Sequence, residues 1–234
     1  MMKYTAIVIA LLCCSGGFAQ KPAPKPTPTK TPAAVPVKSS VAETDEFGRI
    51  EGQKYTNSVH GFQITFPDNW SVNDREFEAI VKPYGIDLSM VVPENFGGPG
   101  KVQMQRKFEN VKVLLYAHHS ISVANAGALV RLAVEDVRLN PVIKDAVDYF
   151  DLMRSQFALM KAPADFKYSE TQAEKLGAKQ FAFLDTSSKN GKKRLYATLR
   201  RGHVILFTMS YTKPEDLATM RQILAGGDFA LQTK

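Results

Sequence analysis

The chain has 234 residues, of which 44% are hydrophobic and 23% charged, and its formal net charge is +7. This length and apolar content suit one well-packed domain or two small ones, and they exclude a chain that is disordered throughout. Two cysteines cannot form the disulfide framework of a miniprotein. The positive charge suggests a nucleic acid or another anionic surface as partner, so its position along the chain matters.

The first residues have the three zones of a secretory signal. Lys3 gives the positive start, and Thr5–Cys14 is an apolar run, which at about ten residues is too short to span a bilayer as a mature helix. The small residues Gly17 and Ala19 predict a signal peptide over residues 1–19, with cleavage after Ala19. We therefore expect a secreted or periplasmic protein whose mature form has no cysteine.

The two cysteines leave one alternative for the N-terminus open. Leu11 lies three positions before Cys14, as in bacterial lipoprotein signals, but Cys13 stands where such a signal usually has a small residue. The pattern therefore favours ordinary cleavage over a lipoprotein anchored at Cys14.

Residues 20–45 are predicted to form a disordered linker rich in proline and lysine. Six of the 13 prolines and four lysines lie within residues 21–40, which contain no acid. Proline fixes φ and lacks an amide donor, so this composition favours a semi-rigid polyproline II spacer. A weak contact of these lysines with an anionic envelope surface is the alternative.

The linker and the signal together account for most of the positive charge. Residues 1–40 contain five lysines and no acid, and subtracting them from +7 leaves +2 for residues 41–234. The folded part is close to neutral, so we expect no binding to nucleic acid.

Residues 46–234 are predicted to form one α/β domain. Phe62–Phe66 alternates apolar and polar residues as a half-buried strand does, and Trp70 returns to the core after a turn. Ile86–Val92 and Val111–Ala117 are further predicted strands. The segment Pro93–Gly100 between them is rich in proline and glycine, so we expect an irregular, mobile loop.

The second half of the chain has clearer patterns. Apolar residues at helical spacing predict helices over Leu129–Val137 and Ile143–Met160. Three antiparallel strands are predicted at Gln180–Asp185, Arg194–Leu199 and Val204–Tyr211.

Turn residues and a helix complete this C-terminal region. Asn190-Gly191 and Arg201-Gly202 tolerate positive φ at the two turns between the three strands. Thr212–Glu215 has the form of a capping box for a last helix that begins near Pro214. Val204–Phe207 is apolar on both faces, which predicts a central strand with helices on each side.

Several of these residues match a known pattern. Gly61, Phe62, Ile64, Phe66, Pro67 and Trp70 resemble the opening strand, turn and tryptophan of PsbP-like domains. The closing order is also similar: a Lys/Asn/Gly hairpin, Tyr196 in a strand, Tyr211 at the end of the next, a helix from Pro214, and Phe229. The resemblance runs from about Tyr55 to Leu231.

This resemblance implies an α/β/α sandwich around a central, mainly antiparallel sheet, as in the PsbP and Mog-like families. Members of the family include photosystem II subunits, and they generally act as binding or assembly modules. The matched residues carry no binding site of the family, so none is transferred to this chain.

Signatures of catalysis and of metal binding are missing from the sequence. GxSxG, GxxxxGK[ST] and HExxH do not occur. His118 and His119 are adjacent at a strand end, where neighbouring side chains point to opposite faces and cannot easily share one metal. His60 and His203 are predicted surface or edge residues. We therefore expect no catalytic, cofactor or metal site.

The predicted function is a secreted or periplasmic, non-enzymatic module that binds a protein or a cell-envelope component. A carrier of a small apolar ligand is the alternative, and an envelope hydrolase using His118 or His119 is a third reading. The predicted contact residues lie in the loop after Pro93 and in a basic turn that also suits a small anion: Asn95, Phe96, Lys189, Asn190, Lys192, Lys193 and Arg194.

Overall fold

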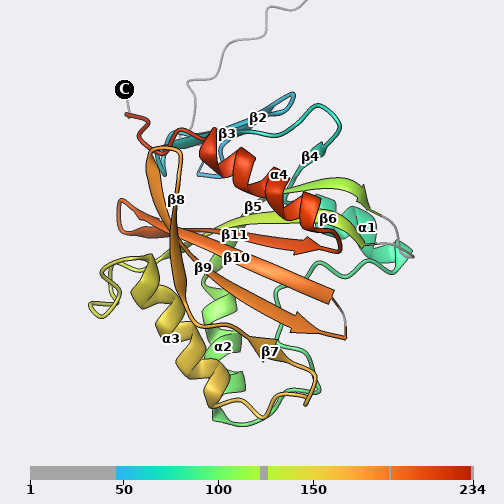
Figure 1. Cartoon of the computed structure of the whole chain (residues 1–234), viewed down its shortest axis with the longest axis vertical. Helices are drawn as coiled ribbons and strands as arrows, with labels where there is room; N and C mark the ends of the chain where they lie inside the picture. The colour runs from blue at the N-terminus through green and yellow to red at the C-terminus, as the bar shows by residue number, and fades with distance from the viewer. Residues whose placement is uncertain (1–45, 122–125, 190, 233–234) are drawn as a thin grey trace, which may run out of the picture. The chain divides into compact units, whose positions relative to one another are not determined.

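The computed structural model of the chain describes residues 46–121, 126–189 and 191–232. The predicted signal peptide (residues 1–19), the predicted linker (residues 20–45) and Asn190 lie outside the described residues. The described part contains a large sheet with helices on both faces and a second, three-stranded sheet (Figure 1).

The large sheet has eight strands in the order β4-β5-β6-β11-β10-β9-β7, and β8 also pairs with β9. Every pairing in both sheets is antiparallel. The strands of the large sheet are β4 (Ser71–Asp74), β5 (Val111–Ile121), β6 (Ala126–Asp136), β7 (Lys167–Tyr168), β8 (Gln172–Leu176), β9 (Lys179–Ser188), β10 (Gly191–Arg200) and β11 (His203–Tyr211). The small sheet contains β1 (Arg49–Glu51), β2 (Lys54–Asn57) and β3 (Phe62–Thr65). The helices are α1 (Phe77–Val81), the 3-10 turn η1 (Lys82–Tyr84), α2 (Pro99–Glu109), α3 (Ala146–Ala158) and α4 (Pro214–Ala225).

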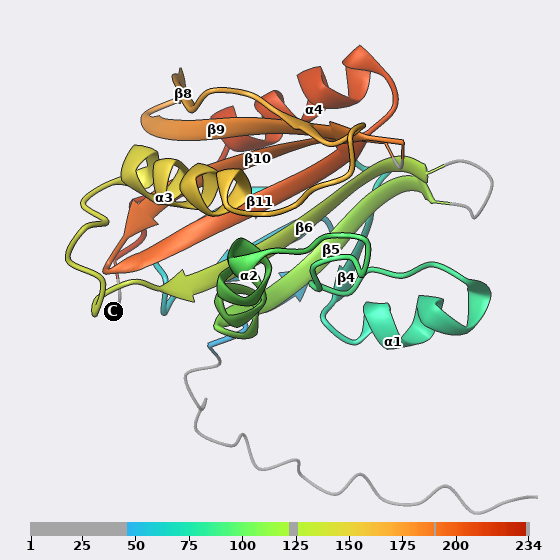
Figure 2. The ribbon, with the colours of Figure 1, turned by 90° about the horizontal axis from the view of Figure 1, so that it is seen from below.

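Strand β11 lies between β6 and β10 and is buried on both faces. Ile205 and Phe207 pack into one apolar cluster with Met220 and Leu224 of α4. Val204 and Leu206 point the other way, into a cluster that includes residues of α2 and α3. In Figure 2, α2 and α3 lie in front of the strands and α4 lies behind them. The predicted α/β/α arrangement around a central antiparallel sheet is therefore confirmed.

The three predicted C-terminal strands are confirmed as β9, β10 and β11. At the turn between β10 and β11, Arg201 has φ 50° and Gly202 has φ 73°, as a tight hairpin turn requires. The last helix begins at Pro214, but its N-cap is Lys213 instead of Thr212. The Asp216 carboxylate accepts a hydrogen bond from the Lys213 amide at 3.2 Å, so Asp216 takes the place that the sequence pattern gave to Glu215.

Three of the predicted segment assignments are wrong. Leu129–Val137 is not a helix: it lies almost entirely in strand β6, where burial on both faces removes the alternation that normally marks a strand. Ile86–Val92 is irregular, because its buried residues Leu88 and Val92 fill apolar clusters without a strand partner. The irregular loop ends earlier than predicted, since Pro99 is the first residue of α2. The predicted helix Ile143–Met160 is confirmed as α3.

A buried ion pair connects α2, β6 and α3. The Lys107 Nζ lies 3.1 Å from both Glu135 carboxylate oxygens and 3.9 Å from the centre of the Tyr149 ring. The Tyr149 hydroxyl donates to the same carboxylate at 2.7 Å. Burial lowers the pKa of Lys107, against the opposing effect of Glu135, and burial raises the pKa of Tyr149. Each polar group of the network has a partner, as buried charge requires.

We expect Glu135→Gln to lower the free energy of unfolding by about 3 kcal/mol, because it leaves the Lys107 ammonium buried without a counter-charge. The matched control is Asp136→Asn, at the next residue, which pairs with Arg138 at the surface and should change stability little. Urea unfolding measures both. The double variant Lys107→Met/Glu135→Leu should recover most of the loss, and a double variant as unstable as Glu135→Gln would contradict this account.

His60 is buried, at only 5% exposed, so its predicted place as a surface or edge residue is wrong. Its ring lies edge-on to that of His203, with 4.7 Å between the ring centroids, and its Nδ1 is buried without a partner in the described part of the chain. Burial and the nearby charges of His203, Lys112 and Arg201 lower the pKa of His60 to about 4, against an opposing effect of Glu46.

Stability should therefore fall as the pH drops below 6.5. The unfolded chain takes up a proton on His60 near its ordinary pKa of about 6.5, whereas the folded chain does so only near pH 4. Between pH 7 and pH 5 this difference costs about 2 kcal/mol. Urea unfolding at both pH values should show a smaller loss for His60→Phe than for the control His119→Gln. Equal losses in the two variants would argue against the assignment.

Candidate functional site

The most distinctive surface of the domain is a group of aromatic rings beside the C-terminal end of α3, here called the aromatic end. Phe166 contacts the rings of Phe96, Phe157 and Tyr168, with centroid distances of 5.1, 5.4 and 6.0 Å. Phe157 and Tyr168 also contact each other at 5.3 Å. The rings come from three separate parts of the chain, so tertiary packing alone assembles them.

Backbone contacts hold this end together. Gly97 and Lys161 form an isolated β-bridge, with N–O distances of 3.0 and 2.8 Å. The carboxylate of Asp165 accepts a hydrogen bond from the Lys189 amide at 2.7 Å, which lowers the pKa of Asp165. The segment between Lys161 and Tyr168 therefore connects the two loops for which the sequence predicted a partner contact. The sequence contains no local signal for this connection.

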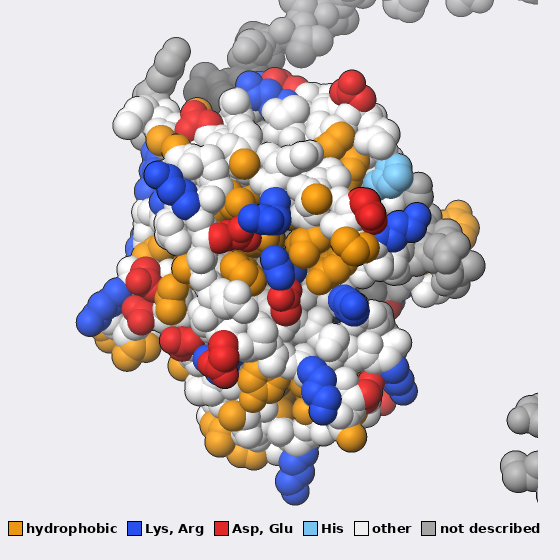
Figure 3. All heavy atoms as spheres, viewed as in Figure 1, with side chains coloured by type: hydrophobic (Ala, Val, Ile, Leu, Met, Phe, Trp, Pro, Cys, Tyr) orange, Lys and Arg blue, Asp and Glu red, His pale blue; other side chains and the backbone are white. Residues whose placement is uncertain are grey.

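The aromatic end is apolar at its centre and basic around it. Leu159 and Tyr168 are 51% and 38% exposed, and Phe166 is half-buried between its neighbours. Lys161, Lys167 and Lys189 are exposed. Figure 3 shows hydrophobic side chains gathered at the lower end of the domain, with both basic and acidic side chains around them.

The structure divides the predicted contact residues between different environments. Asn95 and Lys192 are exposed. Arg194 is engaged inside the protein: it forms two hydrogen bonds of 2.7 Å with the Asp185 carboxylate, and its guanidinium lies 4.3 Å from the centre of the Phe183 ring. Successive side chains of a strand point to opposite faces, so Lys193 lies on the face of β10 opposite to that of Lys192 and Arg194. The turn therefore does not present its cations as one patch.

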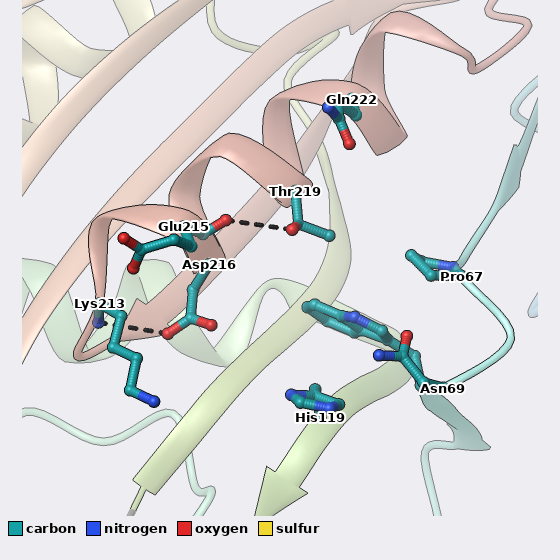
Figure 4. Close-up of a pocket in the computed structure, with 9 residues that line it drawn as sticks. Pro67, Asn69, His119, Lys213, Glu215, Asp216, Thr219 and Gln222 are labelled. Carbon is teal, nitrogen blue, oxygen red and sulfur yellow. Dashed lines mark hydrogen bonds between the residues drawn. The ribbon is translucent and has the colours of Figure 1, made fainter.

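A groove lies on the other side of the sheet, along α4 (Figure 4). It has a volume of about 730 Å³, is open to solvent, and is lined by Pro67, Asn69, Trp70, His119, Lys213, Glu215, Asp216, Thr219 and Gln222. In Figure 4, Lys213, Glu215 and Asp216 come from the first turn of α4, and His119 comes from the sheet below. Two of these side chains are already used within the helix, because Asp216 accepts from the Lys213 amide and Thr219 donates to the Glu215 carbonyl.

The groove contains an imidazole but no acid–base pair among the described residues. His119 lines the groove, and it has no hydrogen bond to a carboxylate in that part of the chain. His118 faces the opposite side of β5, where its ring stacks on Phe77 at 5.1 Å and burial lowers its pKa. A catalytic histidine is normally oriented by a hydrogen-bonded partner, and no carboxylate among the described residues holds either imidazole in this way.

In residues 46–121, 126–189 and 191–232, no group of three or more His, Cys, Asp or Glu side chains is placed to hold a metal ion. No helix in the same ranges has the length and hydrophobicity that a membrane span needs.

The structure is similar to the solution structure of cyanobacterial PsbP from Synechocystis sp. PCC 6803, with 11% sequence identity and a TM-score of 0.42. The similarity covers 82% of this chain and 98% of that protein. No protein-family model matches the sequence, and no curated protein matches it. The α/β/α architecture stated above rests on the strand pairing and helix packing of the chain itself.

The aromatic end depends on the close approach of α2 and α3 at Gly100. A Cβ atom at Gly100 would overlap the Gln156 carbonyl oxygen and lie 2.9 Å from the Met160 amide. We expect Gly100→Ala to separate the helices and to lower stability by about 1–3 kcal/mol. Gly226→Ala is the control, because the nearest atom there is 3.4 Å away. Thermal unfolding measures both, and equal melting temperatures would refute the close-contact explanation.

Proposed function

We propose that this chain is a non-enzymatic, PsbP-like binding module that docks onto a protein partner through the aromatic end. The observation that supports the proposal is the contact of Phe166 with three other aromatic rings at the surface. Aromatic groups that are packed yet reachable are typical of the residues that dominate binding energy at protein interfaces. The exposed Leu159 and Tyr168 extend this surface.

The charged residues near the aromatic end indicate what kind of surface the partner has. Lys161 and Lys167 are exposed on the segment that carries Phe166 and Tyr168, and exposed Lys189 is tied to that segment by its amide, which donates to the Asp165 carboxylate. Complementary charge steers association and selects partners, so we expect a partner with an apolar centre and acidic residues around it. The predicted signal peptide and linker would place this encounter in the periplasm or outside the cell.

The two other readings of the sequence have less support. A carrier of a small apolar ligand would need an enclosed apolar cavity, whereas the groove along α4 is open and lined by charged and amide side chains such as Lys213, Glu215 and Gln222. A hydrolase that uses His119 would need a group to orient the imidazole. We therefore favour docking over transport or catalysis.

We expect the double variant Leu159→Ser/Tyr168→Ala to lose at least about tenfold in affinity for its partner, since interface hot spots contribute about 2 kcal/mol or more. The matched control is Leu139→Ser, which also removes an exposed leucine (98% exposed) but lies in the loop before α3. Capture from an extract of the producing cell's envelope, quantified for wild type and both variants, gives the comparison.

A protein retained by wild type and Leu139→Ser but lost with the double variant supports the proposal. Equal retention by all three forms would show that the aromatic end is not the docking surface. If no protein is retained, and the wild type binds anionic lipid vesicles but the double variant does not, the partner is a membrane surface.

A further inference from the structure

The face of the sheet that carries α2 and α3 has a polar strip between its two apolar clusters. Leu206 and Ala197 belong to the cluster under α2 and α3, whereas Tyr116 and Phe77 belong to the cluster beside α1. Between them, adjacent strands place Arg131 of β6, Thr208 of β11 and Lys193 of β10 on this same face. A polar strip in an otherwise apolar layer calls for a physical reason.

Arg131 is held in place on one side and has no partner on the other. Its Nη1 donates to the Leu88 carbonyl at 3.1 Å, while its Nε is buried and has no hydrogen-bond partner in the described part of the chain. The charge of Glu78 raises the pKa of Arg131 against the effect of burial. The Glu78 carboxylate accepts a hydrogen bond from the Tyr116 hydroxyl and forms no ion pair with Arg131. The guanidinium therefore has an N–H group that is free to donate a hydrogen bond to a ligand.

Lys193 lies close enough for the charge of Arg131 to act on it. Burial, and then the charge of Arg131, lower the pKa of Lys193, yet its side chain remains exposed to solvent. Among residues 46–121, 126–189 and 191–232, no carboxylate forms an ion pair with Lys193. Two cations whose charges repel, without an acid between them, are stabilised when an anion binds both.

The register brings a hydroxyl between the two cations. Thr208 is directly opposite Arg131 on one side and Leu195 on the other, and Lys193 is two residues from Leu195 on the same face. Strand spacing puts the Arg131 and Lys193 Cα atoms on the order of 12 Å apart, a gap that two long side chains can close around one ligand. Thr208 is 7% exposed.

We propose that Arg131, Lys193 and the Thr208 hydroxyl form a binding site for an oxyanion of the phosphate type. The guanidinium offers its unpaired Nε–H, the ammonium adds a second positive charge, and the hydroxyl donates between them. Arginine and lysine together are the usual protein partners of phosphate oxygens. The ligand is either free phosphate or the phosphate ester of a larger molecule. The site adjoins the aromatic end, because Lys193 and Tyr168 are both opposite Thr186 of β9.

The test is phosphate binding by the full chain at constant ionic strength, with chloride as the reference anion. We expect phosphate to raise the melting temperature of the wild type, and calorimetric titration with inorganic phosphate to give an affinity at least tenfold weaker for Lys193→Met. Methionine keeps the length of the side chain and removes the charge. Lys192→Met is the control, because the neighbouring lysine is also exposed but points to the opposite face of β10.

Titration with glycerol 3-phosphate in parallel distinguishes the two sources of the anion, since the tighter ligand shows whether an ester is preferred. Absence of phosphate binding by the wild type would overturn the proposal. Equal binding by Lys193→Met and Lys192→Met would also overturn it, because it would show only non-specific attraction. Neither variant changes Leu159 or Tyr168, and phosphate binding is measured without a protein partner, so failure here is distinguishable from failure of the docking proposal.

Discussion

The burial of β11 on both faces is the constraint on which the rest of this structure depends. Ile205 and Phe207 require cover on one side, and Val204 and Leu206 require it on the other. The two faces are covered by different elements and different types of contact. Helix α4 and the small sheet close the first face with apolar contacts, whereas α2 and α3 close the second with apolar contacts and the buried pair of Lys107 with Glu135. The candidate sites lie at the margins of this second layer, where α3 ends and where the sheet is covered by polar groups.

Local sequence signals predicted the fold best where turn chemistry and strand pattern agreed. The strands β9 to β11 are separated by short turns, and Gly202 adopts the positive φ that its position requires, so both the strands and their antiparallel pairing were predictable. The same reasoning failed at Leu129–Val137, because a strand buried on both faces can show helical spacing by coincidence. It also missed α2, since Gly98-Pro99-Gly100 looks like a loop, although Pro99 suits the first turn of a helix.

The candidate sites were predictable only in part, for a physical reason. The sequence singled out Phe96 and the turn around Lys189, but the residues that join them, Asp165 and Phe166, lie far away in the chain and carry no motif. Likewise, the basic run at the start of β10 suggested a single cationic patch. Strand alternation divides it, because Arg194 is satisfied by Asp185 while Lys193 faces the other side of the sheet. Contacts of this kind depend on register and packing, which no short sequence window contains.

The central claim is that the aromatic end is the surface that meets a partner. Site-specific photo-crosslinking in the intact producing cell tests it most directly, with a photoreactive phenylalanine analogue placed at Tyr168 or, as reference, at Leu139, which is the more exposed of the two positions. The account predicts a discrete crosslinked protein from position 168 and none from position 139. Crosslinks that are equal at both positions, or that form only from position 139, would contradict it.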